Sequence, residues 1–173
     1  MRCAYPDTRG YEPRLGTVRA NTKTIGEITE AIVLAEFLKA GFSVLLPFGE
    51  NQRYDMVIET GGRFLRVQCK TARVGREASV LAFNATSHDG HRARQSYRGE
   101  ADLFAVYSPH TKQVYVLDVN EVGETIVWLR LTPARNGQEI GVRYAEEHTL
   151  AAWMARQDKI RGELKAYRSV RSR

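Results

Sequence analysis

The segment Arg53-Tyr-Asp-Met-Val-Ile-Glu-Thr-Gly-Gly-Arg-Phe-Leu-Arg-Val-Gln-Cys-Lys70 is the most informative part of the chain, because it predicts a tight β-hairpin. Two runs of strand-forming residues flank Gly61-Gly62, and a Gly-Gly pair supplies the positive φ values that a two-residue hairpin turn needs. With that turn, residues whose numbers sum to 123 lie opposite each other, so Asp55 faces Gln68.

Side chains alternate between the two faces of a strand, and opposed residues share a face. One face is therefore expected to enter the core, and it carries Tyr54, Met56, Ile58, Leu65, Val67 and Cys69. The other face carries Arg53, Asp55, Gln68 and Lys70, grouped at the end away from the turn. This register brings an acid, an amide and an ammonium group within reach of one another.

These three side chains have the chemistry of a site that acts on phosphate esters. A carboxylate and an amide oxygen can hold a hard cation such as magnesium, and a neighbouring lysine can orient the attacking water. Two other interpretations stay open. The hairpin can be an edge element with a solvated polar face on which Lys70 pairs with Asp55, and a slip of one residue would redistribute the faces.

Residues upstream of the hairpin predict a helix and a short strand. Asn21 to Ala40 has apolar residues at helical spacing and Gly41 as its stop; the apolar positions are Ile25, Ile28, Ile32, Ala35 and Leu38. Glu27 is expected in the first turn. With Thr24 it fits a capping box, in which Glu27 would only satisfy the free N–H groups of the helix.

This order of helix, strand and hairpin resembles the PD-(D/E)XK nuclease superfamily, in particular its group I intron homing endonuclease branch. The resemblance extends over residues 21–146 and rests on four segments: Ile25-Gly-Glu27, Leu45 to Asp55, Arg63 to Lys70, and Tyr97-Arg-Gly-Glu-Ala-Asp-Leu-Phe-Ala-Val-Tyr107. It implies a restriction-endonuclease-like α/β (α+β) core, in which helices flank a mixed β-sheet.

The resemblance also implies roles for individual residues. Asp55 corresponds to the central metal ligand, Gln68 to the second ligand and Lys70 to the cation that orients water. Glu27 corresponds to an outer acid that acts through a metal-bound water, and Glu30, one turn further along, is its competitor for this role. The usual second acid of the superfamily is Asp or Glu, so Gln68 removes one negative charge and gives more weight to the backbone carbonyl of Cys69. The Cys69 side chain itself is expected to pack in the core.

Composition agrees with one globular domain. The chain has 173 residues, of which 43% are hydrophobic and 27% charged, and only two cysteines, Cys3 and Cys69. It has no apolar stretch of membrane-spanning length and no signal-peptide pattern, so we expect a cytoplasmic protein that joins the nucleoid when it binds DNA, with no membrane partner.

Positive charge is concentrated near the C-terminus. Residues 156–173 contain seven Lys or Arg and two Asp or Glu, a net charge of +5 out of +6 for the whole chain. Leu150 to Val170 is expected to form a basic amphipathic helix that contacts DNA or a partner helix, or that simply covers the core.

A second basic segment, Ser87 to Arg98, is expected to be a long loop. Together the two segments and the hairpin give the candidate DNA-binding residues, with Tyr97 expected to stack on or position a base: Arg53, Arg92, Arg94, Tyr97, Arg98, Arg156, Lys159 and Arg161. Arg53 has an alternative partner in Glu50. His88 and His91 lack a second ligand pair and do not predict zinc.

The sequence therefore predicts an N-terminal extension (1–20), a nuclease-like domain (21–146) and a basic C-terminal helix (147–173). Further strands are expected at 78–85, 101–107, 113–119 and 125–131, in one mixed sheet of five or six strands.

The predicted activity is magnesium-dependent hydrolysis of DNA phosphodiesters, with manganese as a substitute ion. The resemblance to homing endonucleases implies double-stranded DNA and a homo-oligomer, dimer or tetramer, since cutting both strands needs two centres related by symmetry. The alternatives are a structure-specific nuclease, such as a Holliday junction resolvase, and a non-cleaving DNA-binding protein.

Overall fold

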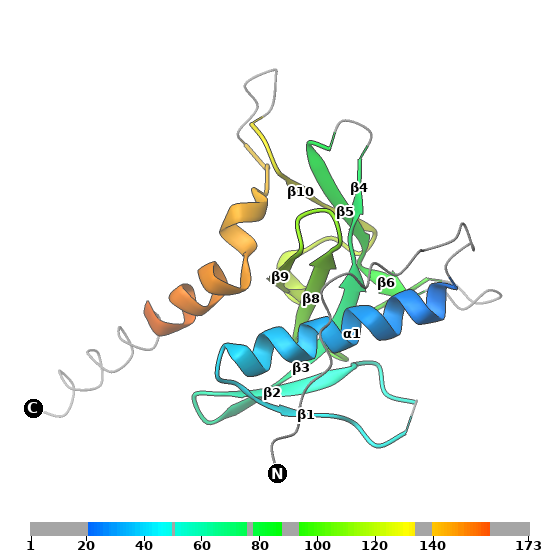
Figure 1. Cartoon of the computed structure of the whole chain (residues 1–173), viewed down its shortest axis with the longest axis vertical. Helices are drawn as coiled ribbons and strands as arrows, with labels where there is room; N and C mark the ends of the chain where they lie inside the picture. The colour runs from blue at the N-terminus through cyan, green and yellow to red at the C-terminus, as the bar shows by residue number, and fades with distance from the viewer. Residues whose placement is uncertain (1–20, 50, 76–77, 88–93, 134–139, 160–173) are drawn as a thin grey trace, which may run out of the picture.

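A five-stranded mixed sheet with one helix across its face organises the protein (Figure 1). The computed structural model describes residues 21–49, 51–75, 78–87, 94–133 and 140–159. Helix α1 (Thr22–Lys39) precedes the sheet, whose strands lie in the order β1 (Ser43–Leu45), β2 (Met56–Thr60), β3 (Arg63–Thr71), β8 (Leu103–Ser108) and β9 (Gln113–Asp118). Within this sheet β3 and β8 are parallel and the other neighbours are antiparallel.

Two smaller sheets complete the described fold. The order in the three-stranded sheet is β10 (Ile126–Arg130), β5 (Val80–Asn84) and β4 (Arg73–Val74), and β6 (Thr86–Ser87) pairs with β7 (Gln95–Ser96). The structure also has two 3-10 turns. The first, η1 (Val119–Glu121), follows β9, and the second, η2 (Ala145–His148), precedes a helical segment at residues 150–159. Among the described residues no helix has the length and apolarity to cross a membrane.

The predicted hairpin register is confirmed. Thr60 lies opposite Arg63, Ile58 opposite Leu65 and Met56 opposite Val67. Gly61 and Gly62 form the turn with φ values of 59° and 75°, the left-handed region that a two-residue turn of this kind requires. The Asp55 N–H then donates to the Val67 carbonyl at 2.9 Å, which continues the pairing up to the predicted site.

Strands β8 and β9 of the main sheet are buried on both faces. Val33 and Phe37 of α1 pack on one face against a cluster that includes Met56, Ile58, Val67, Leu103, Ala105 and Trp153. The opposite face packs against the three-stranded sheet in a second cluster that includes Leu81, Phe83, Phe104, Val106, Leu117 and Leu129. Strand β8 contributes alternately to both clusters, which explains its continuous apolar sequence.

The expected strands are confirmed, but their distribution among sheets differs from the prediction. We expected one sheet of five or six strands, whereas β5 and β10 pair with each other outside the main sheet. Apolar patterns identify strands but not the edges that pair. The two-residue strands β4, β6 and β7 were not expected, because so short a strand has no measurable alternation. Strands β6 and β7 pair with each other, so Ser87, Gln95 and Ser96 of the segment predicted as a loop belong to strands.

Two expectations about buried faces were wrong. The residues of α1 that are buried are Thr29, Val33 and Phe37, whereas Ile28 and Leu38 are each 54% exposed. Apolar residues surround much of this helix, so spacing alone did not identify the buried stripe. Tyr54 packs against the second cluster rather than beside Met56, because β2 begins only at Met56 and strict alternation does not extend to it.

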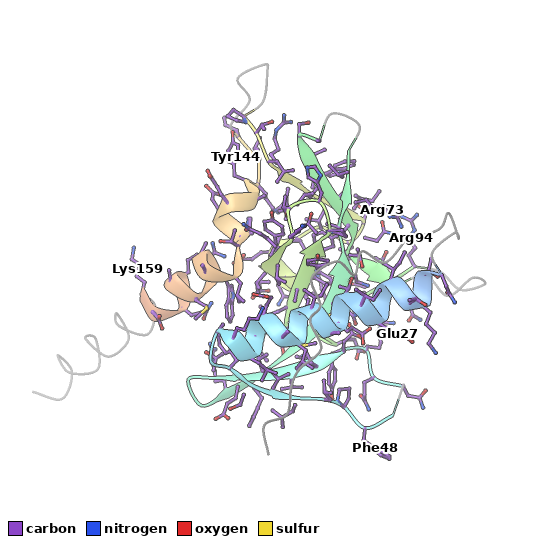
Figure 2. All side chains as sticks on the ribbon, in the orientation of Figure 1. Glu27, Phe48, Arg73, Arg94, Tyr144 and Lys159 are labelled. Atoms are coloured by element: carbon purple, nitrogen blue, oxygen red, sulfur yellow. The ribbon has the colours of Figure 1, made fainter. Side chains whose placement is uncertain are left out.

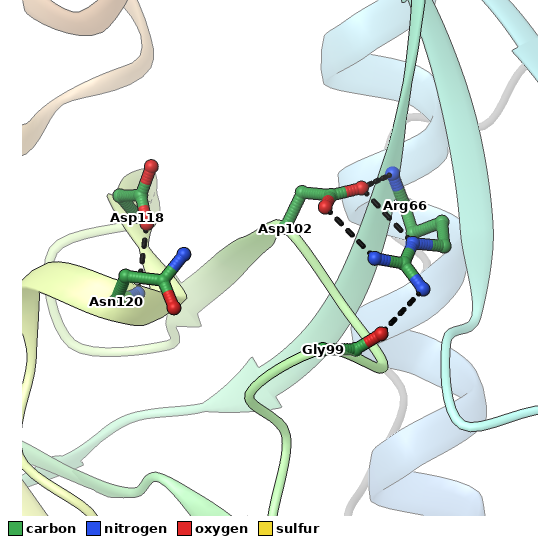
Figure 3. Close-up of polar contacts among 5 residues, drawn as sticks. All are labelled: Arg66, Gly99, Asp102, Asp118 and Asn120. Atoms are coloured by element: carbon green, nitrogen blue, oxygen red, sulfur yellow. Dashed lines mark hydrogen bonds and ion pairs between the residues drawn. The ribbon is translucent and has the colours of Figure 1, made fainter.

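A charged pair fixes β8 beside β3 (Figure 3). The Asp102 carboxylate accepts hydrogen bonds from Arg66 N at 2.8 Å, from Nε at 3.1 Å and from Nη2 at 3.0 Å, and Arg66 Nη1 donates to the Gly99 carbonyl at 2.8 Å. The Arg66 hydrogen bonds lower the pKa of Asp102 below its ordinary value. This bidentate contact holds the segment that leads from Tyr97 into β8.

Candidate active site

Asp55 lies at the centre of the site that the sequence predicted. Its Oδ2 atom accepts one hydrogen bond from Gln68 Nε2 and another from the Cys69 N–H, both at 2.6 Å. Burial raises the pKa of Asp55 above its ordinary value, even though the Cys69 N–H, the Lys70 charge and the Gln68 amide all lower it. The hairpin therefore holds a carboxylate that is only partly compensated for its loss of water.

Gln68 lies next to this carboxylate, as the register predicted. Its amide nitrogen is also 3.3 Å from the Cys69 carbonyl oxygen, so the amide and that carbonyl lie together beside Asp55. The Cys69 side chain is 8% exposed and packs with Val67 in the cluster under α1. Burial, followed by the charges of Asp55 and Glu30, raises the pKa of its thiol well above the ordinary value.

Lys70 is held by a tyrosine from another segment. Its Nζ atom donates to the Tyr97 hydroxyl at 2.8 Å and lies 4.3 Å from the centroid of the Tyr97 ring. Among the described residues Lys70 forms no ion pair with Asp55. The structure also places Tyr97 differently from the expected base-stacking role, because the residue is buried in the second cluster and only 6% exposed.

Helix α1 brings acids toward Asp55. Asn21 caps the helix by accepting from the Lys23 N–H at 3.1 Å, and the first turn contains no acid. The expectation that Glu27 lies in the first turn was therefore wrong, and Thr24 and Glu27 do not occupy capping-box positions, because the cap lies three residues earlier than Thr24. Glu27 is exposed on the N-terminal half of α1, where it is labelled in Figure 2.

Glu30 is an acid on α1 whose pKa is raised in part by the charge of Asp55. Partial burial raises the pKa of Glu30 first, and the negative charges of Asp55 and Glu27 raise it further. A hydrogen bond of 2.6 Å between the hydroxyls of Thr29 and Thr71 attaches this part of α1 to β3, next to Lys70. Glu30 is exposed like Glu27, and the sequence identified it only as a competitor, because spacing along a helix does not show which of two acids interacts with Asp55.

Arg53 is attached to β7 rather than extended into solvent. Its Nη1 donates to Gln95 Oε1 and its Nη2 to the Ser96 carbonyl at 2.8 Å, and the guanidinium lies 4.8 Å from the Tyr97 ring centroid. The sequence predicted that Arg53 contacts phosphate or pairs with Glu50, and neither prediction included these bonds to β7. Glu50 lies outside the described residues. No pattern in the sequence marked Gln95 or Ser96 as partners.

The other candidate DNA-binding residues are dispersed. Arg94 is exposed. The Nε atom of Arg98 forms an ion pair with Glu124 Oε1 at 3.3 Å, and its Nη2 atom donates to the Val122 carbonyl at 3.2 Å. Arg156 and Lys159 are exposed on the helical segment 150–159, and Arg156 donates to the Glu147 carbonyl. Arg92, Arg161, His88 and His91 lie outside the described residues.

The donors at the site fit a magnesium ion held mainly by water. Among the described residues no three or more His, Cys, Asp and Glu side chains form a metal-binding group. One carboxylate, one amide and one backbone carbonyl do lie together, at Asp55, Gln68 and Cys69. Magnesium prefers oxygen ligands, retains several waters and often uses only one or two carboxylates.

Comparison with known proteins identifies a family and a similar fold. A family model described as PD-(D/E)XK endonuclease matches residues 20–151. The bacterial homing endonuclease I-Ssp6803I has a similar structure, with a TM-score of 0.65 and 23% sequence identity over 83% of this chain and 98% of that chain.

A Holliday junction resolvase, Hjc of Archaeoglobus fulgidus, matches less well, with a TM-score of 0.40 and 22% identity over 67% of this chain and 92% of that chain. No curated protein sequence matches the chain.

Proposed function

Because the chain belongs to the PD-(D/E)XK endonuclease family, we propose that it hydrolyses phosphodiester bonds of duplex DNA with a divalent metal, magnesium in the first place. The observation that carries the proposal is the cluster at the end of the hairpin, where the Asp55 carboxylate, the Gln68 amide and the Cys69 backbone lie within hydrogen-bond distance of one another. Lys70 lies two residues after Gln68 on β3, and its charge acts on the Asp55 carboxylate.

Each side chain has a definite task in this proposal. Asp55, Gln68 and the Cys69 carbonyl would hold the metal, which would supply charge stabilisation at the phosphate and an activated water. The amide nitrogen of Gln68 faces Asp55, so the amide would have to turn over for its oxygen to serve as a ligand. Lys70 orients the attacking water and opposes the charge that develops on phosphate. Glu30 or Glu27 accepts hydrogen bonds from water on the α1 side.

The homing-type reading of the substrate is part of the same proposal. I-Ssp6803I, whose fold the chain resembles, is described as a bacterial homing endonuclease, and this favours a duplex over a junction. Cleavage of both strands needs two centres, so we propose a homo-oligomer that acts on DNA in the cytoplasm.

A cleavage assay with one matched control tests the proposal. Purified protein is incubated with supercoiled plasmid, linear duplex and a four-way junction, in Mg²⁺, Mn²⁺ or EDTA. We expect metal-dependent cutting of duplex DNA, and a loss of about a hundredfold or more in Asp55→Asn, because the metal supplies both charge stabilisation and the nucleophile. Asp118→Asn is the control, since Asp118 has no part in the proposed metal site. Its carboxylate caps η1 by accepting a hydrogen bond from the Asn120 N–H (Figure 3).

Each other outcome has a clear meaning. Cutting confined to the four-way junction would replace the duplex substrate with a structure-specific one. Binding without cutting in any metal would leave a DNA-binding protein on a nuclease fold. Undiminished cutting by Asp55→Asn would remove Asp55 from the site.

Glu27→Gln and Glu30→Gln compared in the same assay decide which acid serves the metal-bound water. Glu30→Gln is expected to lose more activity, because Glu30 is the acid whose pKa is raised by the charge of Asp55. A larger loss in Glu27→Gln would restore the role that the family resemblance gave to Glu27.

A further inference from the structure

The ammonium group of Lys70 has a fixed contact with the second core cluster. A lysine side chain is flexible and its ammonium is a compact charge with three donors, so nothing in the side chain itself fixes where that charge lies. Here Nζ donates to the Tyr97 hydroxyl at 2.8 Å and lies 4.3 Å from the ring centroid. Among the described residues no other side chain accepts a hydrogen bond from Lys70, so its remaining donors are left for water or phosphate.

Tyr97 is itself held rigidly. The residue is 6% exposed, and its ring meets the Phe104 ring edge-on at 86° with centroids 5.6 Å apart. Its carbonyl accepts from the N–H groups of Glu100 and Ala101 at 3.0 and 2.9 Å. The position of the hydroxyl is therefore set by the core of the protein and by the turn that leads into β8.

Arg53 adds a second cation to the same ring. Its guanidinium lies 4.8 Å from the Tyr97 centroid and is attached to Gln95 and Ser96 on β7. Cations are attracted to the face of an aromatic ring, so Arg53 fastens β7 and Tyr97 to the residues just before Asp55. Tyr97 thus connects the two sides of the site, the approach to β2 and the end of β3.

We propose that Tyr97 is a positioning residue that holds the Lys70 ammonium in the place where it orients the attacking water, an inference that rests on the proposed nuclease function. The Tyr97 hydroxyl accepts a hydrogen bond from the Lys70 ammonium. Tyr97 acts through Lys70 and is not itself assigned a contact with DNA.

Tyr97→Phe tests the proposal, because it keeps the ring, its packing and the ring–cation contacts and removes only the acceptor. Misplacement of a catalytic group by about an ångström can cost about a hundredfold in rate. We expect kcat to fall by about 10- to 100-fold while KM for DNA and the metal concentration for half-maximal rate stay within about twofold of the wild type.

Tyr115→Phe is the matched control. Tyr115 belongs to the same cluster, is 3% exposed, and loses an equivalent hydroxyl contact, the 2.9 Å bond to Thr111 Oγ1. If the effect of Tyr97→Phe were only a loss of stability, the two variants would lose melting temperature and activity together. We expect both to lose stability and only Tyr97→Phe to lose kcat; an equal loss of kcat in both would overturn the proposal.

A double-mutant cycle shows whether Tyr97 acts through Lys70. Effects of two residues that serve one function are not additive. Adding Tyr97→Phe to Lys70→Ala is expected to change the residual rate by less than about twofold. A further drop equal to that of the single variant would mean that Tyr97 contributes independently of Lys70, which contradicts the proposal.

The contact can also be followed without cleavage, by NMR of the ¹⁵N-labelled lysine ammonium groups. The Lys70 signal is expected to shift and to lose order in Tyr97→Phe and to stay unchanged in Tyr115→Phe. An unchanged Lys70 signal in Tyr97→Phe would overturn the inference whether or not the wild-type protein cuts DNA. Absence of cleavage by the wild type, with the NMR change present, would instead refute the proposed function.

Discussion

Asp55 combines two opposing requirements in one side chain. Burial raises the pKa of this carboxyl above its ordinary value, although the Cys69 N–H, the Lys70 charge and the Gln68 amide favour the ionised form. The folded protein therefore carries a net electrostatic cost at neutral pH, and a cation next to Asp55 would reduce it. Such a cost is typical of a residue retained for function rather than for stability.

Replacing Asp55 with Asn is expected to stabilise the folded protein at neutral pH. Both hydrogen bonds to the carboxylate end on Oδ2, so a single amide oxygen can accept them both. Because the folded pKa is raised, the native state binds the proton more tightly than the unfolded state, and wild-type stability falls as the pH rises from the ordinary carboxyl pKa of 3.8 through the folded value.

The melting temperature of the Asp55→Asn protein without metal should thus exceed that of the wild type at pH 7–8, and the gap should narrow toward pH 4. Each kcal/mol corresponds to about 2–4 °C in a chain of this size. Added Mg²⁺ should raise the melting temperature of the wild type more than that of the variant. A variant that is less stable at every pH would mean that the charge of Asp55 stabilises the fold, contrary to this account.

At the scale of elements, the hairpin is the part that the sequence predicts in most detail. The two strands are adjacent along the chain, and Gly61 and Gly62 both have positive φ, so one turn of two residues determines every pair between β2 and β3. The pairing of Asp55 with Gln68 follows from that register alone. Local sequence therefore determines the position of the two central residues.

Gly62→Ala tests the dependence of the site on this turn. The φ of Gly62 is 75° and no atom lies within 4 Å of the position of an added Cβ, so the cost comes from backbone strain and not from a clash. We expect a loss of about 1 kcal/mol in unfolding free energy in denaturant. Gly61→Asn is the control, because Asn-Gly suits the same turn. A Gly62→Ala protein as stable as the wild type would contradict the turn geometry.

The contacts between elements are what the sequence does not predict. Lys70 and Tyr97 are 27 positions apart, and their hydrogen bond forms only because Tyr97 precedes the strand that pairs with β3. The choice between Glu27 and Glu30, the attachment of Arg53 to β7 and the position of Tyr54 likewise depend on tertiary packing. Periodicity carries no information about these contacts, because the partner of each side chain lies on an element that is distant in the sequence.

At the scale of the whole molecule, the N-terminal half of α1 and the described end of the helical segment 150–159 lie on opposite sides. In Figure 2, Glu27 and Arg94 lie on one side of the molecule and Lys159 lies on the other. The helical segment 150–159 is attached to the sheet through Trp153, which is 4% exposed and belongs to the cluster under α1. Arg156 and Lys159 are therefore expected to meet DNA bound at the site through a long duplex or through a second copy of the chain.

Deletion of residues 160–173 tests the role of the positive charge near the C-terminus while it keeps the Trp153 attachment. The deleted segment contains five Lys or Arg and one Glu, a net charge of +4. If these charges contact phosphates, each contact releases counterions and contributes about 0.9 to the slope of log K against log salt concentration. We expect the slope to flatten by about two to four units, with weaker binding to all sequences and unchanged cleavage at saturating DNA.

A full-length variant with its five basic residues in 160–173 changed to Gln separates charge from chain length. It should reproduce the flatter salt slope of the deletion if phosphate contacts are responsible. If the segment instead joins copies of the chain, the deletion lowers the molar mass in light scattering and the Gln variant keeps its salt slope. If both proteins bind DNA with the wild-type salt slope, the prediction of DNA contact is wrong. Each phosphate contact contributes to that slope, so the loss of such contacts must change the slope.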